Sequence, residues 1–163
     1  MKFHLNHDPA NKTLTIPRAA LQLSGLAETS DLAIHTENGC VLLLPEKLSG
    51  IFKHKVLNPL HPLTRGFDDR FYAPHSRYTS IHREDIDKNP NLITLSVSNM
   101  AGVYLVASKS GRQVFVTGHA EYDRDTLANE YFRDVKKGIH PKIPVNYFPD
   151  DDVETTPYFT WKS

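Results

Sequence analysis

His119 and Glu121 lie two residues apart in the segment V-F-V-T-G-H-A-E-Y-D, residues 114–123. In an extended or turning backbone both side chains can project to one side, so the carboxylate can accept the imidazole Nδ1 proton. Such a hydrogen bond fixes the tautomer and stabilises the imidazolium, which leaves Nε2 to take a proton from a nucleophile. A histidine in a structural turn is the alternative, and the spacing taken alone favours it.

Two further groups of residues have the chemistry of a ligand site. Glu130 and Arg133 are three residues apart on a predicted helix and therefore share one face. They could form an intrahelical ion pair, or they could bind the two charged groups of an amino acid. In A-P-H-S-R-Y, residues 73–78, a turn stiffened by proline could present Ser76 or Arg77 to a ligand, or could be an ordinary surface loop.

The elements around these residues predict an α/β fold. Residues 92–98, 103–107 and 112–117 read as strands, and the last is mostly apolar, which favours burial. Residues 125–137 predict an amphipathic helix that ends at Gly138. Its apolar stripe is Leu127, Ala128, Tyr131, Phe132 and Val135. His119 would then lie at the carboxyl end of a strand, where open α/β folds place their active sites.

Prolines interrupt the chain from residue 46 onward, on both sides of residues 92–137. Pro59, Pro62 and Pro74 argue against long regular elements there, because proline has a fixed φ and no amide donor. Pro141, Pro144 and Pro149 predict a C-terminal loop without a core. From residue 46 onward, the sequence therefore predicts regular structure mainly between residues 92 and 137.

The composition excludes several classes of protein. Nineteen Lys and Arg balance nineteen Asp and Glu, so no whole-chain field attracts nucleic acid or an anionic membrane. The nine histidines are scattered without metal-ligand spacing, so we expect no metal. The single cysteine excludes an internal disulfide, and no apolar run has the length of a membrane span. Without a signal-peptide pattern, the expected location is the cytoplasm.

The pattern of predicted elements changes near Pro45. Before it, a strand at 13–16, a helix at 18–24 and a hairpin of strands at 31–36 and 40–44 are predicted, with Glu37-Asn38-Gly39 as the turn. This arrangement resembles the swapped-hairpin DNA-binding module of the AbrB and MazE kind. The resemblance implies a homodimer, since so small a module cannot bury a core alone. The charge balance leaves DNA binding and a plain interaction module at even odds.

From residue 46 to 163 the motifs resemble, in order, those of homoserine O-acyltransferases. They are E-K-L-S-G, L-T-R-G-F-D-D-R-F, A-P-H-S-R-Y, G-V-Y-L-V-A-S-K, V-F-V-T-G-H-A-E-Y-D, Y-F-R-D-V and N-Y-F-P-D-D-D. The resemblance implies the C-terminal half of an α/β domain with a class I glutamine amidotransferase-like, flavodoxin-like sheet. Two domains follow: residues 1–45, a small AbrB-like module, and residues 46–163, the acyltransferase-like part.

The resemblance also implies an activity and its residues. Enzymes of this family belong to methionine biosynthesis and move an acetyl or succinyl group from acetyl-CoA or succinyl-CoA to L-homoserine, without a bound cofactor. His119 would be the general base and Glu121 its partner. By the same resemblance Lys47, Ser76 and Arg133 contact the substrate, and Glu130 is a second candidate for the homoserine amine.

The family nucleophile, a cysteine upstream of E-K-L-S-G, has no counterpart here. Cys40 lies in a predicted hairpin strand with no following helix to lower its pKa, so it is not a substitute. Ala120 stands where the family commonly has proline, and the family continues beyond Ser163. We therefore expect exposed apolar surface and no activity unless another chain supplies the cysteine. An AbrB-like regulatory protein carrying an acyltransferase-derived segment, or a junction of two reading frames near Pro45, are the alternatives.

Overall fold

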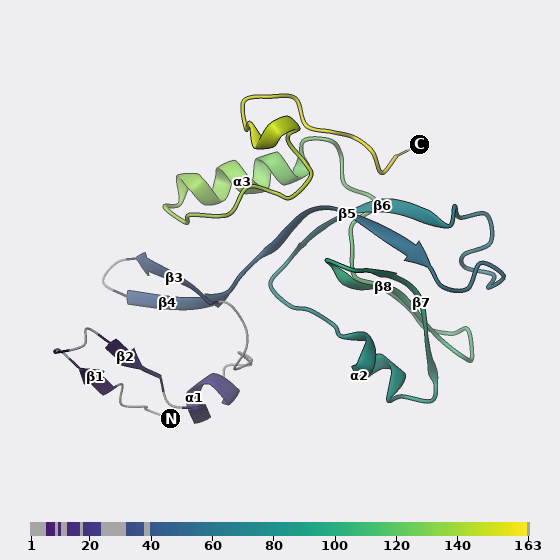
Figure 1. Ribbon diagram of the computed structural model, residues 1–163, viewed down its shortest axis with the longest axis horizontal. Coiled ribbons are helices and arrows are strands. Elements are labelled where there is room, and N and C mark those ends of the chain that lie inside the picture. The colour runs from purple at the N-terminus through teal and green to yellow at the C-terminus, as the bar shows by residue number, and fades with distance from the viewer. Residues whose placement is uncertain are drawn as a thin grey trace. The chain divides into compact units, whose positions relative to one another are not determined.

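A computed structural model describes residues 6–8, 10, 13–16, 18–23, 32–37 and 40–162 (Figure 1). The chain divides into two compact units, Met1–Glu46 and Lys47–Ser163. The division falls beside the predicted boundary near Pro45, although the identity of each part as a separate domain stays a prediction. Each unit is described by itself.

The first unit contains two antiparallel strand pairs and one short helix. Strands β1 (Asn6–Asp8) and β2 (Thr13–Thr15) pair with each other, as do β3 (Leu32–Glu37) and β4 (Cys40–Pro45). Helix α1 (Arg18–Leu23) lies between the pairs in sequence. The predicted helix and the two later strands are confirmed to within a residue or two, while Asn38 and Gly39 of the predicted turn lie outside the described residues.

The second unit is built on a five-stranded sheet in which every pairing is antiparallel (Figure 1). Its order is β6-β5-β7-β8-β9. The strands are β5 (Leu48–Val56), β6 (Arg70–Arg77), β7 (Leu92–Ser98), β8 (Gly102–Ser108) and β9 (Val114–Val116). Short helix α2 (Arg83–Asp87) precedes β7. The α/β class is therefore confirmed, but His119 does not follow a parallel strand in the described sheet.

Strands β5 and β6 occupy a region for which loops were predicted. They pair over eight residues, from Leu48 opposite Arg77 to Lys55 opposite Arg70. The expectation of a loop was wrong because Pro74 lies on an edge strand, where its missing amide hydrogen costs no ladder bond. The carbonyl of Pro74 points away from β5 and accepts a hydrogen bond from the His119 amide at 2.8 Å.

Strand β9 is the other edge of the sheet, and its exposure contradicts the prediction that it is buried. Val114, Phe115 and Val116 are 46%, 47% and 53% exposed. Successive strand residues point to opposite faces, so both faces of β9 are uncovered. An apolar run on both faces is typical of a strand buried inside a sheet. The prediction was wrong because the described residues provide no neighbour on the outer side of β9.

Helix α3 (Thr126–Lys136) and the C-terminal segment lie against the first half of β5 (Figure 1). A core cluster holds them there: Ile51, Leu127, Ala128, Tyr147 and Phe148. The C-terminal segment, which includes the short 3-10 helix η1 (Pro149–Asp151), was predicted to carry no core. That prediction was wrong, since Tyr147 is fully buried and donates a hydrogen bond to the Arg124 carbonyl.

The buried face of α3 also differs from its predicted stripe. Phe132 and Val135 are 37% and 46% exposed, whereas Asp134 is 4% exposed. A carboxylate is buried only where it is paired, and Asp134 contacts Arg133 and Lys47. Apolar periodicity could not predict that Asp134 is buried, because its burial depends on a lysine 87 residues away.

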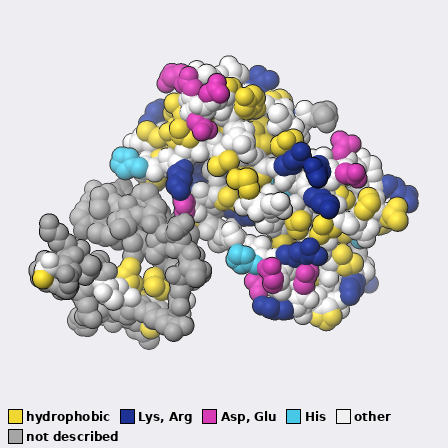
Figure 2. Space-filling view, viewed as in Figure 1, with side chains coloured by type: hydrophobic (Ala, Val, Ile, Leu, Met, Phe, Trp, Pro, Cys, Tyr) yellow, Lys and Arg dark blue, Asp and Glu magenta, His cyan; other side chains and the backbone are white. Residues whose placement is uncertain are grey.

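A second core lies on the opposite side of β5 and β6, inside the curl of the sheet. It consists of Ala73, Leu95, Tyr104, Leu105 and Ala107. Outside these cores the visible surface mixes charged and hydrophobic side chains (Figure 2). No helix among the described residues is long and apolar enough to span a membrane.

Candidate active site

His119 is held by its neighbours on both the main chain and the side chain. Its Nδ1 lies 2.8 Å from Glu121 Oε1, and its amide donates to the Pro74 carbonyl at 2.8 Å. The pKa of Glu121 is lowered, first by its own backbone amide and then by His119. The ring is 35% exposed. This geometry is the orientation that a base needs, with Nδ1 occupied by the carboxylate and Nε2 available.

Gly118 sets the entry of the chain into this turn. A Cβ at Gly118 would lie 2.6 Å from a ring carbon of Tyr104, 2.9 Å from the Pro74 carbonyl oxygen and 3.0 Å from His75. The backbone therefore passes between β8 and β6 at a point where only glycine fits. This close approach places His119 beside Pro74 in the middle of β6.

Tyr122 was not singled out from the sequence. Its ring stacks on His119, with centroids 4.4 Å apart and planes 13° apart. Its hydroxyl donates to Glu130 Oε1 at 2.9 Å. Burial, and after it Glu130, raises the pKa of Tyr122 to about 12, so the hydroxyl remains a donor at neutral pH. The only sequence signal was its place in the G-H-A-E-Y-D segment.

Glu130 of α3 is the centre of the network. Its Oε2 accepts hydrogen bonds from Lys47 Nζ at 2.9 Å and from the Ser76 hydroxyl. Burial acts to raise the pKa of Glu130, but the hydrogen bonds from Ser76, Lys47 and Tyr122 outweigh it, so the pKa is lowered. Glu130 is therefore a carboxylate that three donors hold in place.

Arg133 pairs with Asp134 and not with Glu130, so the intrahelical pair considered from the sequence does not form. Arg133 Nε and Nη2 lie 2.9 and 2.8 Å from Asp134 Oδ1, and Lys47 Nζ lies 3.4 Å from Oδ2. Burial acts to raise the pKa of Asp134, but Arg133 and Lys47 lower it overall. Asp134 was missed from the sequence, and it orients both cations.

The structure thus joins the residues predicted for the site into one network. His119 and Glu121 reach Glu130 through Tyr122, and Glu130 reaches Ser76 and Lys47. Arg133 joins through Asp134. Their roles in a reaction remain predictions. The side chain of Cys40 is outside the described part of the structure. Among the described residues no group of His, Cys, Asp or Glu has the arrangement of a metal site.

The family model of homoserine O-succinyltransferase matches residues 29–163. The chain belongs to this family. The resemblance inferred from the motifs is thereby confirmed, and the match begins 17 residues before residue 46, inside the part assigned to the AbrB-like module. The regulatory alternative built on that module has no support from the comparisons.

Individual relatives agree with the family assignment. The chain is 58% identical over 120 residues to homoserine O-acetyltransferase of Thermotoga petrophila and 55% identical over 121 residues to that of Lachnospira eligens. It is 56% identical over 117 residues to homoserine O-succinyltransferase of Photorhabdus laumondii. These matches cover 72–74% of the chain but only 38–39% of each relative. Relatives named acetyltransferases and a relative named a succinyltransferase have similar identity to the chain. The matched region therefore does not distinguish the two acyl donors.

Proposed function

We propose that this chain supplies the general base and the homoserine site of a homoserine O-acyltransferase. The observation that carries the proposal is the Glu130 carboxylate, which joins Lys47, Ser76 and Tyr122 beside the His119–Glu121 pair. An ordinary surface ion pair does not gather three donors on one half-buried carboxylate next to an oriented histidine. The acyl donor would be acetyl-CoA or succinyl-CoA.

The charges of the network suit L-homoserine, which carries an ammonium and a carboxylate. A guanidinium has five N–H donors, and Asp134 takes two of those of Arg133, so the rest can bind the substrate carboxylate. Glu130 can accept a hydrogen bond from the ammonium, while Ser76 and Lys47 fix the carboxylate of Glu130. The substrate hydroxyl would then face His119.

His119 would transfer protons in both halves of the reaction. It first takes the proton of a cysteine thiol, whose thiolate attacks the acyl thioester and releases coenzyme A with that proton. It then takes the proton of the homoserine hydroxyl as that oxygen attacks the acyl-cysteine. The cysteine thiolate that leaves takes the proton from His119, so both the base and the cysteine return to their starting states.

Residues 46–163 contain no cysteine, and Cys40, the only cysteine in the sequence, lies in a hairpin strand without a following helix. The nucleophile would therefore come from another segment. Strand β9 gives a place for such a segment, because its outer edge is unpaired in the described sheet and both faces are apolar and exposed. A further strand added there would extend the sheet toward the class I glutamine amidotransferase-like fold and would end near His119. For residues 1–45, an AbrB-like arrangement and a homodimer stay predictions, as does a cytoplasmic location.

Homoserine binding tests the substrate site without requiring catalysis. We expect L-homoserine to bind the chain by isothermal titration calorimetry, and Arg133→Gln to weaken binding at least tenfold because it removes the charged donor. Lys136→Gln, on the same helix, is the matched control and should leave the affinity within a factor of two. Equal affinity of Arg133→Gln and the wild type would rule out this carboxylate site.

Complementation tests the catalytic part of the proposal. The chain is mixed with the part of the Thermotoga petrophila enzyme that lies outside the matched residues, with acetyl-CoA and L-homoserine. We expect acyl transfer by the mixture, none by either part alone, and loss of at least 100-fold with His119→Ala. Transfer by the chain alone would contradict the need for another segment. Unchanged transfer with His119→Ala would exclude His119 as the base.

A further inference from the structure

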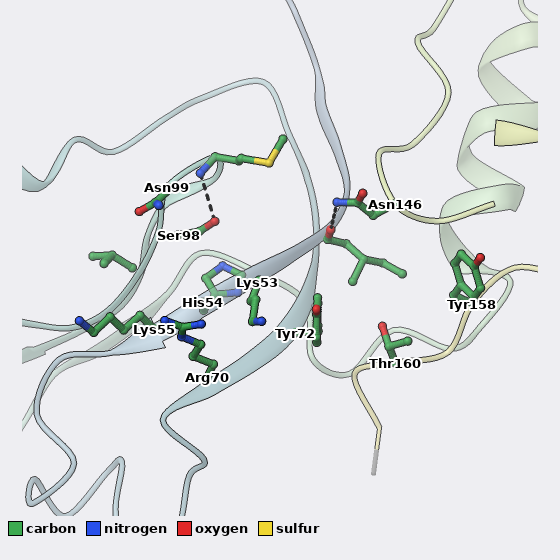
Figure 3. A pocket seen from close by; sticks show the side chains of 13 residues that line it. Lys53, His54, Lys55, Arg70, Tyr72, Ser98, Asn99, Asn146, Tyr158 and Thr160 are labelled. Atoms are coloured by element: carbon green, nitrogen blue, oxygen red, sulfur yellow. Dashed lines mark hydrogen bonds between the residues drawn. The ribbon is translucent and has the colours of Figure 1, made fainter. Parts of the chain in front are cut away.

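A pocket of about 660 Å³ opens on the second unit where β5 and β7 diverge (Figure 3). The two strands pair only at Lys55 with Val97 and Val56 with Ser96. The volume is in the range of small-molecule sites. The residues described above as the candidate active site do not line this pocket.

The pocket is lined by cations without any carboxylate. Lys53 and Lys55 come from β5 and Arg70 from β6. The other polar side chains of the lining are uncharged, including His54, because burial lowers its pKa to about 4. In the described range 40–162 none of the three cations forms an ion pair, although Lys53 lies 5.8 Å from the centre of the Tyr72 ring. Figure 2 shows several Lys and Arg side chains, with acidic side chains beside them, over the part of the unit where Figure 1 places β5 and β6. This charge favours an anion.

Two aromatic rings border the same space. Tyr72 comes from β6 and Tyr158 from the C-terminal segment, and they are 41% and 48% exposed (Figure 3). Exposed rings next to cations suit a ligand that combines a flat heterocycle with phosphate groups, because the ring stacks on tyrosine while the phosphates contact Lys and Arg. Asn99 and Asn146 add uncharged polar side chains to the lining.

We propose that this pocket binds the 3′-phosphoadenosine diphosphate end of the acyl donor, an inference that rests on the proposed function. Tyr72 and Ser76 lie four residues apart on one face of β6, which corresponds to roughly 13 Å, and Arg70 lies roughly 20 Å from Ser76. The arm that joins the nucleotide to the thiol of coenzyme A has a comparable extended length. The phosphates are held by Lys53, Lys55 and Arg70.

The test measures binding of adenosine 3′,5′-bisphosphate to the full chain by calorimetry at fixed, stated salt. We expect Lys53→Gln combined with Arg70→Gln to raise the Kd at least tenfold and to reduce its dependence on salt. Lys109→Gln, an exposed lysine outside the pocket, is the control and should change the Kd less than twofold. An unchanged Kd in the double variant, or no binding by the wild type at millimolar ligand, would overturn the proposal.

A second variant separates a nucleotide site from a simple phosphate site. Tyr158→Leu should weaken the binding of adenosine 3′,5′-bisphosphate and leave the binding of inorganic pyrophosphate unchanged. An equal loss of affinity for both ligands, or equal affinity of the wild type for both, would refute the nucleotide assignment. The pocket variants should bind L-homoserine as the wild type does. Failed homoserine binding with intact nucleotide binding would count against the proposed function alone, and the reverse result against this pocket alone.

Discussion

Lowering the pH from 7 to 4.5 should cost the second unit about 5 kcal/mol of its free energy of unfolding, mainly through His54 and His75. Burial lowers the pKa of His54 to about 4 and, with a further contribution from Arg77, that of His75 to about 3. Both rings are neutral in the folded state, while the unfolded chain binds protons below pH 6.5. Stability is therefore complete above pH 6.5 and is lost as the pH falls toward 4.

The two rings form one hydrogen-bonded unit. Their Nε2 atoms lie 2.9 Å apart, and Arg77 Nη1, which can only donate, contacts His75 Nδ1. His75 must therefore carry its proton on Nε2 and donate it to His54. The other titratable groups that face the pair are Tyr104 and His119. Glu130 and Asp134, whose pKa values are lowered, lose their contribution mainly as the pH falls below their ordinary pKa values of 4.5 and 3.8. Most of the change between pH 6.5 and 4.5 therefore comes from the histidines.

Urea denaturation at a series of pH values measures this effect. His54→Gln retains an acceptor for His75 but does not titrate, so it should remove about half of the acid-dependent loss. His140→Gln, an exposed histidine, is the control, and its curve should run parallel to that of the wild type. A wild-type free energy of unfolding that is constant between pH 7 and 4.5 would show that the pair is not buried in its neutral form.

Gly50→Ala should destabilise the second unit by at least about 4 kcal/mol, an unusually large effect for one methyl group. Gly50 has φ +144°, and a Cβ there would lie 2.3 Å from the Val145 carbonyl oxygen and 2.5 Å from its nitrogen. These backbone atoms bond to Ile51 and Ser49 at 2.8 and 2.9 Å. The substitution would separate the C-terminal segment from β5 and with it the core around Tyr147.

Gly66→Ala is the matched control for this prediction. Gly66 also has a positive φ, +88°, but a Cβ there would meet no atom within 4 Å. It should cost only about 1 kcal/mol, from backbone strain alone. Thermal unfolding of the two variants compares them directly. A loss at Gly50 no greater than at Gly66 would mean that the contact with Val145 does not hold the C-terminal segment.

Local patterns predicted the elements that depend on nearby residues. The strand at 92–98 agrees with β7 to the residue, and the helix at 125–137 is longer than α3 by one residue at each end. The errors concern long-range partners. Pro74 is compatible with β6 only because β6 is an edge, and the C-terminal segment has a core only because Tyr147 meets Ile51 and Leu127.

The same distinction applies to the site. His119 and Glu121 could be paired from their spacing, and the ordered motifs added Lys47, Ser76 and Arg133. The functions of Tyr122 and Asp134 in the network depend on partners 8 and 87 residues away. No periodic pattern in the sequence reports contacts of that kind, so these two residues could be found only from the structure.

Three consecutive residues of β6 each hold a different part of the site: Pro74 by its carbonyl, His75 by its buried ring beside Gly118, and Ser76 by its hydroxyl on Glu130. Strand side chains alternate between faces, so a slip of β6 by one residue against β5 would turn the imidazole outward and the hydroxyl inward. A mispaired β6 would therefore not form the network around Glu130. Correct strand pairing and assembly of this network are a single event, and refolded protein should contain either complete networks or none.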